Sequence, residues 1–433
     1  MTTGANAPRR GGLLRALRHP GYRMFWVAAL LSNTGTWLSN LAVPYVLYQT
    51  TGSAVWVGWA AVAQFAPALI FAPLGGTLAD THDRRLLLLW TQAGLAATGL
   101  FMWLAWAFGP QEPLVLVGLL TLFGILNGIN NPAWQSLVND LVPPAEIFSA
   151  VTLNSLQFNL ARALGPMSAG ALLATLGATW AFFLNAVSFV FVIAALLVVR
   201  AHPARCAPRA AAGFGRGWRE AVGFIRGNPG IRITILLSVM LGLFGNPIFQ
   251  LTAVFAEDVY AVGPVGLGLL TSALGVGSVL FAVAGALRRV PSVTARSVAG
   301  GLVVLAVSLV AMGVAPTLPL GIVAAVAVGA GFLAAISGVN TALQLLAGDL
   351  MRGRVLAVRH MFYSAAISAG TVGQGIATDT WGVRWATIGA GVVLAVVVLM
   401  IGVWPRHSGF VALDAVPPDA RVPTAKMEES SAA

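Results

Sequence analysis

Arg162 is the residue whose type and position most demand a chemical explanation. It is the only charged residue in the apolar run 147–175. A charge at the centre of a bilayer costs at least ~2.5–3.5 kcal/mol, so it must face a cavity, water or polar partners. Two roles stay open for it. It is either a structural charge satisfied by neighbouring helices, or a residue that contacts a substrate or a gate.

The residue sets used in covalent or metal-dependent catalysis do not occur. The sequence has no His-Glu-x-x-His, no Gly-x-Ser-x-Gly and no Gly-x-x-x-x-Gly-Lys, and its five histidines are scattered. A single cysteine, Cys206, excludes an internal disulfide and a cysteine-based metal site. We therefore expect no enzyme, no metal site and no bound cofactor.

The elements that must position Arg162 are membrane helices. Of the 433 residues, 58% are hydrophobic and 9% charged, whereas soluble domains have roughly 45–50% apolar and about 25% charged residues. This excludes a soluble enzyme and a soluble DNA-binding protein. Runs long enough for a spanning helix of roughly 20 residues fall at 22–48, 54–79, 86–108, 113–140, 147–175, 179–199, 231–256, 264–287, 297–315, 319–346, 354–378 and 385–404.

The distribution of basic residues sets the topology. All of the 25 Lys and Arg except Arg162 and Arg384 fall in the two tails, on alternate connections or in the ends of the spans that adjoin them, as the positive-inside rule requires. With six spans on each side of the central connection, both termini are cytoplasmic. The net charge of +11 therefore reflects topology, and nucleic acid is not an expected partner.

The same pattern predicts five segments. A cytoplasmic N-terminal tail covers residues 1–21, a first six-helix bundle 22–199, a cytoplasmic connector 200–230, a second six-helix bundle 231–404, and a disordered cytoplasmic tail 405–433. Apolar residues recur at helical spacing in the second part of the connector, with arginines between them. This predicts an amphipathic helix on the inner leaflet, serving as a tether or, alternatively, as a regulatory or partner site.

The two halves resemble each other. Asn131, Ala133, Gln135, Leu137, Asp140 and Leu141 recur 209 positions later as Asn340, Ala342, Gln344, Leu346, Asp349 and Leu350. Such repeats are typical of transporters built from two related bundles around a midplane site.

The six-helix repeat, the basic connector and the segment Gly75-Gly76-Thr77-Leu78-Ala79-Asp80-Thr81-His82-Asp83-Arg84-Arg85 together resemble the major facilitator superfamily. The Arg-Ala-Leu-Gly-Pro run of the fifth span resembles the bacterial drug and siderophore exporter branch, which includes enterobactin exporters and macrolide efflux pumps. The resemblance implies an all-α integral membrane protein with twelve transmembrane helices in two six-helix bundles.

The resemblance also implies a cytoplasmic gate formed by Gly76, Asp80, Arg84, Arg85 and Asp140. Gly76 would permit close helix approach. Asp80 would face the N-terminus of the eleventh helix, and Arg84 would pair with a carboxylate such as that of Asp140. The sequence departs from the family pattern at Thr81 and Asp83, and Arg289 replaces the aspartate in the second half.

An antiporter-type motif is implied for the fifth span by Arg162, Gly165, Pro166 and Gly170. The resemblance further places amides of four spans around a substrate cavity, although each is equally suited to hydrogen bonds between helices. The candidate cavity residues are Asn33, Trp37, Asn40, Asn127, Asn131, Trp134, Asn246, Gln250, Asn340 and Gln344.

The residues give little indication of which gradient drives transport. No Asp or Glu lies in the middle of a span, and the candidates to carry a proton are Asp80, Asp140, Asp349 and His360. The resemblance implies a proton gradient as the driving force. Transport driven by the substrate gradient alone stays open.

We therefore expect a monomeric secondary transporter of the bacterial inner membrane, with several passes through the lipid bilayer. It would export a small amphipathic molecule, a drug or a metabolite, by alternating access and proton antiport. The expected activity is efflux, and its expected effect on the cell is multidrug resistance. The alternatives are a dedicated siderophore or secondary-metabolite exporter and a flippase for lysophospholipids or other lipids.

Overall fold

We describe residues 14–199, 214–288 and 294–403 of a computed structural model, and the regular structure in these ranges is helical. Our expectations for the start of the N-terminal tail, for the first part of the connector and for the disordered tail from 405 onward concern residues outside these ranges. The described residues group by their contacts into two units.

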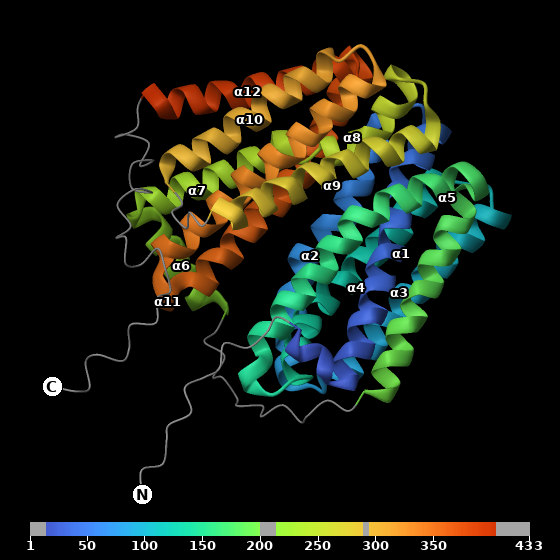
Figure 1. Ribbon diagram of the computed structural model, residues 1–433, viewed down its shortest axis with the longest axis vertical. Coiled ribbons are helices and arrows are strands. Elements are labelled where there is room, and N and C mark those ends of the chain that lie inside the picture. Colours follow the sequence, from blue (N-terminus) through green and yellow to red (C-terminus); the bar gives the residue numbers. More distant parts are fainter. Residues whose placement is uncertain (1–13, 200–213, 289–293, 404–433) are drawn as a thin grey trace, which may run out of the picture. The chain divides into compact units, whose positions relative to one another are not determined.

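Unit 1 holds the helices of the first half of the chain. They are η1 (Arg15–Arg18), α1 (Pro20–Thr51), α2 (Ala54–Thr81) from Trp59 onward, α3 (Arg84–Phe108), α4 (Pro113–Asp140), η2 (Pro144–Glu146) and α5 (Ile147–Val198), joined by Val262–Ser272. In Figure 1, α1, α3, α4 and α5 run side by side, and α5 contacts both α1 and α3. Gly177, with φ 80° and ψ 175°, divides α5 into two helices; glycine adopts such a conformation without steric cost.

Unit 2 holds the helices of the second half. They are α6 (Phe214–Gly227), α7 (Pro229–Met240), the π-helical turn η3 (Leu241–Gly245), α8 (Ile248–Val254), a second π-helical turn η4 (Phe255–Val259), α9 (Gly263–Arg288) from Ala273 onward, α10 (Ala295–Val314), α11 (Leu318–Trp381) and α12 (Val383–Val403), with Ser53–Gly58. In Figure 1, α10 lies beside both α11 and α12. Gly348, with φ 62°, divides α11 as Gly177 divides α5.

The described helices match the twelve predicted spans. Nine stretches are long and apolar enough to cross a membrane. One of these, Ser149–Val198, contains two spans because of the break at Gly177. Helix α1 and the part of α11 after Gly348 bring the number to twelve. The seventh span is continuous from Pro229 to Val259 but includes both π-helical turns.

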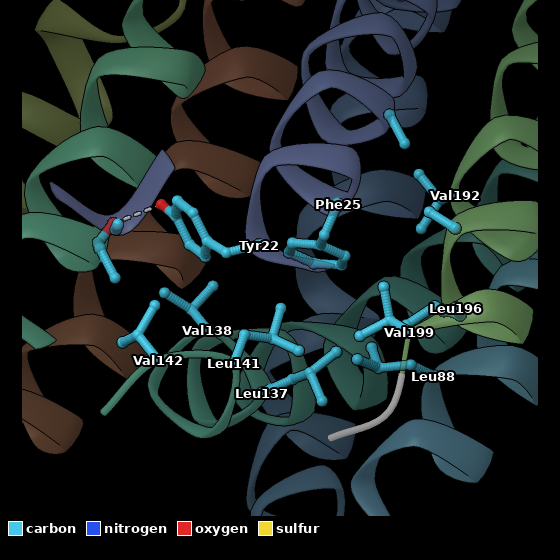
Figure 2. Close-up of a cluster of buried hydrophobic side chains, with 14 of the residues drawn as sticks. Tyr22, Phe25, Leu88, Leu137, Val138, Leu141, Val142, Val192, Leu196 and Val199 are labelled. Atoms are coloured by element: carbon cyan, nitrogen blue, oxygen red, sulfur yellow. Dashed lines mark hydrogen bonds between the residues drawn. The ribbon is translucent and has the colours of Figure 1, made fainter. Parts of the chain in front are cut away.

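A buried apolar cluster lies at one end of unit 1, with side chains from α1, α3, α4 and α5. Figure 2 shows Tyr22 and Phe25 lying among aliphatic side chains that include Leu88, Leu137 and Leu196. The hydroxyl of Tyr22 donates to the carbonyl of Ala150 at 2.7 Å. Because lipid is as apolar as these side chains, packing and hydrogen bonds hold the helices together.

Close helix approach in unit 1 depends on glycines of α4. A Cβ built on Gly124 would lie 2.6 Å from the carbonyl oxygen of Ala63, and one built on Gly128 would lie 2.9 Å from the Cα of Ala68. These obstacles are backbone atoms of α2, which cannot rotate away. At Gly118, on the same helix, nothing lies within 4 Å.

We predict that Gly124→Ala lowers the midpoint of thermal unfolding of the purified protein, because overpacking of this kind costs about 1–3 kcal/mol. Gly118→Ala is the matched control and should leave the midpoint unchanged or raise it slightly, since alanine favours helix. The measurement is intrinsic tryptophan fluorescence during heating in detergent. Equal midpoints for the two variants would contradict the packing described for α2 and α4.

Candidate functional site

Arg84 is the centre of the predicted gating motif. Its Nη1 donates to both carboxylate oxygens of Asp140, at 3.1 and 2.8 Å, and its Nε donates to the carbonyl of Ala79 at 3.0 Å. Helices α2, α3 and α4 therefore meet at one guanidinium. The side chains of Arg84 and Asp140 are 20% and 16% exposed, so this pair is better shielded from solvent than a surface ion pair.

The position of Asp140 explains why it needs this partner. It is the last residue of α4, where unpaired carbonyls and the helix dipole disfavour a negative charge. The positive charge of the Arg84 guanidinium offsets both the negative charge of the carboxylate and the partial negative charge at the C-terminal end of α4. Arg84 is thus paired with the carboxylate expected from the resemblance.

Asp80 differs from Asp140 in its surroundings. Its carboxylate lies 4.0 Å from Arg84 Nη2, and its side chain is 74% exposed. In unit 1, Asp80 is therefore at the solvent-facing edge of the Arg84 cluster. Asp83, by contrast, has a local role, because its Oδ1 accepts hydrogen bonds from the backbone of Arg85 at 2.8 Å and of Leu86 at 3.3 Å and caps α3.

The two remaining members of the predicted gate, Arg85 and Gly76, differ in their contacts within unit 1. Arg85 donates to the carbonyls of Leu196 and Leu197, the second at 2.7 Å, and so satisfies the end of α5. The close approach expected at Gly76 is made by Gly75 instead. A Cβ on Gly75 would lie 2.6 Å from the Cα of Ile129, whereas nothing lies within 4 Å of one on Gly76.

The antiporter-type segment of α5 packs through its glycines. A Cβ on Gly165 would lie 2.5 Å from the side chain of Trp37, and one on Gly170 would lie 2.5 Å from the Cα of Gly268. Pro166 is buried inside the helix. Arg162 is half-buried and has a partner in the structure, which agrees with the requirement that its charge be satisfied.

In unit 1, two predicted cavity residues hydrogen-bond to neighbouring helices. Asn40 accepts from Gln64 Nε2 at 2.9 Å. The indole of Trp134 donates to Asn154 at 3.3 Å, and its ring centroid lies 4.6 Å from that of Phe25. Asn40 and Trp134 therefore form hydrogen bonds between helices. Among the others, Asn33 and Asn127 are half-buried and Asn131 is exposed.

In unit 2, two of the four predicted amides belong to a network centred on Arg359. Its Nη1 donates to Asn340 Oδ1 at 3.1 Å and its Nε to Ser238 Oγ at 3.0 Å. Its guanidinium carbon lies 5.5 Å from the ring centroid of Tyr363, whose hydroxyl accepts from Asn246 at 3.4 Å. Gln250 and Gln344 are half-buried. Asn246 and Asn340, predicted separately, are thus joined by two residues that we had not selected.

Arg359 was not among the residues expected in the site, because in the sequence it lies with the basic residues 352–359 that set the topology. The structure buries it, with 4% of its surface exposed. The sequence does place Arg359 four residues before Tyr363 in the predicted eleventh span, so the two side chains lie on one face of the helix. This spacing could have indicated that Arg359 belongs to the site.

The described residues contain no group of three or more His, Cys, Asp or Glu that could hold a metal ion. What the two networks can do is form and break ion pairs and hydrogen bonds at helix ends and between spans. Both suit conformational change and the binding of a polar solute.

Comparison with known proteins gives relatives that are transporters. The staphyloferrin A transporter of Staphylococcus aureus (strain NCTC 8325 / PS 47) is 27% identical over 181 residues, which cover 42% of this chain and 45% of the relative. The enterobactin exporter EntS of Citrobacter koseri is 27% identical over 192 residues, covering 44% of this chain and 46% of the relative. These matches span about half the length of each relative.

Solved structures show the same fold over nearly the whole chain. A bacterial homologue of the human lysosomal transporter Spinster superposes with a TM-score of 0.72 at 14% identity, covering 96% of this chain and 100% of that one. A mutant form of the nucleoside transporter NupG gives a TM-score of 0.70 at 14% identity, covering 88% of this chain and 99% of that one.

A family model described as transmembrane secretion effector matches residues 12–429. Together with the twelve spans and the fold of the solved transporters, this match identifies the chain as a member of the transmembrane secretion effector family of major facilitator superfamily transporters.

Proposed function

We propose that this protein exports a siderophore or a chemically similar metabolite across the bacterial inner membrane by alternating access. The observation that carries the proposal is the Arg84 cluster, a partly shielded ion pair joining the ends of three helices. Such a pair can hold one conformation and be released in another. Two relatives, whose names specify siderophore transport or export, favour this substrate class over drugs.

In this proposal, Asp80 completes the cytoplasmic gate. Its exposed carboxylate is available for the N-terminal end of a helix, where unpaired amides and the dipole favour an anion. The contacts of Asp80 and of Arg84 form in one state of the cycle, where they hold the cytoplasmic side shut, and break in the other. We place both termini in the cytoplasm and take the monomer as the functional form.

The proposed driving force is the proton gradient. Support comes from the resemblance of the fifth span to the antiporter-type motif, with Pro166 inside the helix and Gly170 closely packed. Driving by the substrate gradient alone is the competing mechanism. Broad drug efflux and lipid flipping are the competing substrate assignments.

Export is tested in cells that make enterobactin and lack its exporter. We predict that expression of this chain lowers the enterobactin retained in the cytoplasm and raises the amount in the medium, as measured by mass spectrometry. A protonophore should abolish the difference. If export persists with the protonophore, proton coupling is wrong. If enterobactin and staphyloferrin A are both retained while a cationic dye or a labelled lipid is moved, the siderophore assignment is wrong.

The gate is tested by Asp80→Asn. We predict normal expression and a fall in transport rate of about 5-fold or more, the range expected when a coupling interaction between states is lost. Asp83→Asn is the matched control, since asparagine caps a helix as well as aspartate does and the same charge is removed three residues away. Equal transport by the two variants would show that Asp80 has no part in gating.

A further inference from the structure

Arg359 is a buried cation whose observed partners are all neutral. It is 4% exposed, and among the described residues no carboxylate lies within the 4.0 Å that defines an ion pair with it. Its partners are a serine hydroxyl, an amide oxygen and the face of a tyrosine ring. These groups orient the guanidinium and leave its charge uncompensated.

The fold assembles this arrangement from three stretches of unit 2. Ser238 belongs to α7, Asn340 to the part of α11 before Gly348, and Arg359 to the part after it. The left-handed break at Gly348 lets the two parts of α11 face each other, so that residues 19 positions apart are bonded at 3.1 Å. The guanidinium is therefore fixed from two sides before any ligand arrives.

The donors of Arg359 are only partly used. A guanidinium has five N–H groups. The structure gives acceptors to its Nε and to Nη1, and none of the described residues accepts from Nη2. Around it, Asn246, Asn340 and Tyr363 are only half-buried. These three residues, which are more exposed than Arg359, are called its rim.

A buried charge within a membrane segment is energetically costly, and such residues commonly mark the path of a substrate. A purely structural role would be served as well by a neutral donor to Ser238 and Asn340. The positive charge and the unused donors both suit an anion with more than one oxygen, since a guanidinium binds carboxylates through paired hydrogen bonds.

We propose that Arg359, with Asn246, Asn340 and Tyr363 at its rim, binds an anionic oxygen group of the transported molecule, a carboxylate or an equivalent pair of negatively charged oxygens. The identity of the molecule rests on the proposed function. Ser238 acts as a positioning residue through its bond to Nε. The site itself requires only that the substrate carry such a group.

The experiment measures anion binding directly, without transport. Protein reconstituted in nanodiscs is heated with increasing citrate or with its neutral trimethyl ester, and the unfolding midpoint gives the dissociation constant, since a ligand of the folded state stabilises it. We expect citrate to raise the midpoint and the triester not to. Arg359→Gln should weaken citrate binding about 10-fold or more, as expected for loss of charge-assisted hydrogen bonds.

Two further variants separate binding from folding. Arg354→Gln removes the same charge from the same helix, at an exposed residue that pairs with Glu220, and should bind citrate as the unmodified protein does. Arg359→Lys keeps the charge without the planar fork and should bind citrate with intermediate affinity. If Arg359→Gln does not fold, the Arg359→Lys comparison decides, and unchanged affinity in that variant overturns the proposal.

The proposal is also overturned if the unmodified protein does not respond to citrate, if the triester binds as tightly, or if Arg359→Gln binds citrate with unchanged affinity. The proposed function is judged separately. Citrate binding that depends on Arg359, in a protein that exports neither enterobactin nor staphyloferrin A, supports the anion site and refutes the siderophore assignment. Siderophore export that is unchanged in Arg359→Gln refutes the site and leaves that assignment standing.

Discussion

The constraint on which this structure depends is that polar groups within a bilayer must find their partners inside the protein. Backbone groups meet it by forming helices. Within the described ranges, both long helices break at a glycine with positive φ, Gly177 in α5 and Gly348 in α11. Charged groups meet the same constraint at helix ends, where Arg84 pairs with Asp140 and Arg85 satisfies the last carbonyls of α5.

Arg84 and Arg359 meet this constraint with different kinds of partner. The difference suits Arg84 to a conformational role and Arg359 to a binding role. Arg84 has a carboxylate partner, so its charge is compensated and the pair can act as a structural joint. Arg359 is held by a hydroxyl, an amide and an aromatic ring. A cation that is oriented but not neutralised is suited to receive an anion from outside the chain.

The duplicated halves have diverged at equivalent positions. Asn131 and Asn340 correspond in the repeat, yet Asn131 is exposed while Asn340 accepts a hydrogen bond from a buried guanidinium. The sequence repeat gives the two helices the same polar residue. The different neighbours of each copy explain why only Asn340 belongs to a charged network.

Composition, the basic residues and hydrophobic run length by themselves determined the membrane class and the twelve spans, because insertion into lipid depends on local apolar length and charge. The resemblance of the segment after the second span to the superfamily motif likewise implied the Arg84–Asp140 pair. Tertiary structure decided that Gly75 rather than Gly76 makes the close approach, that Asn40 bonds to Gln64, and that Arg359 is buried. Such outcomes depend on which helix faces each residue, and helical spacing specifies a face without specifying the neighbour.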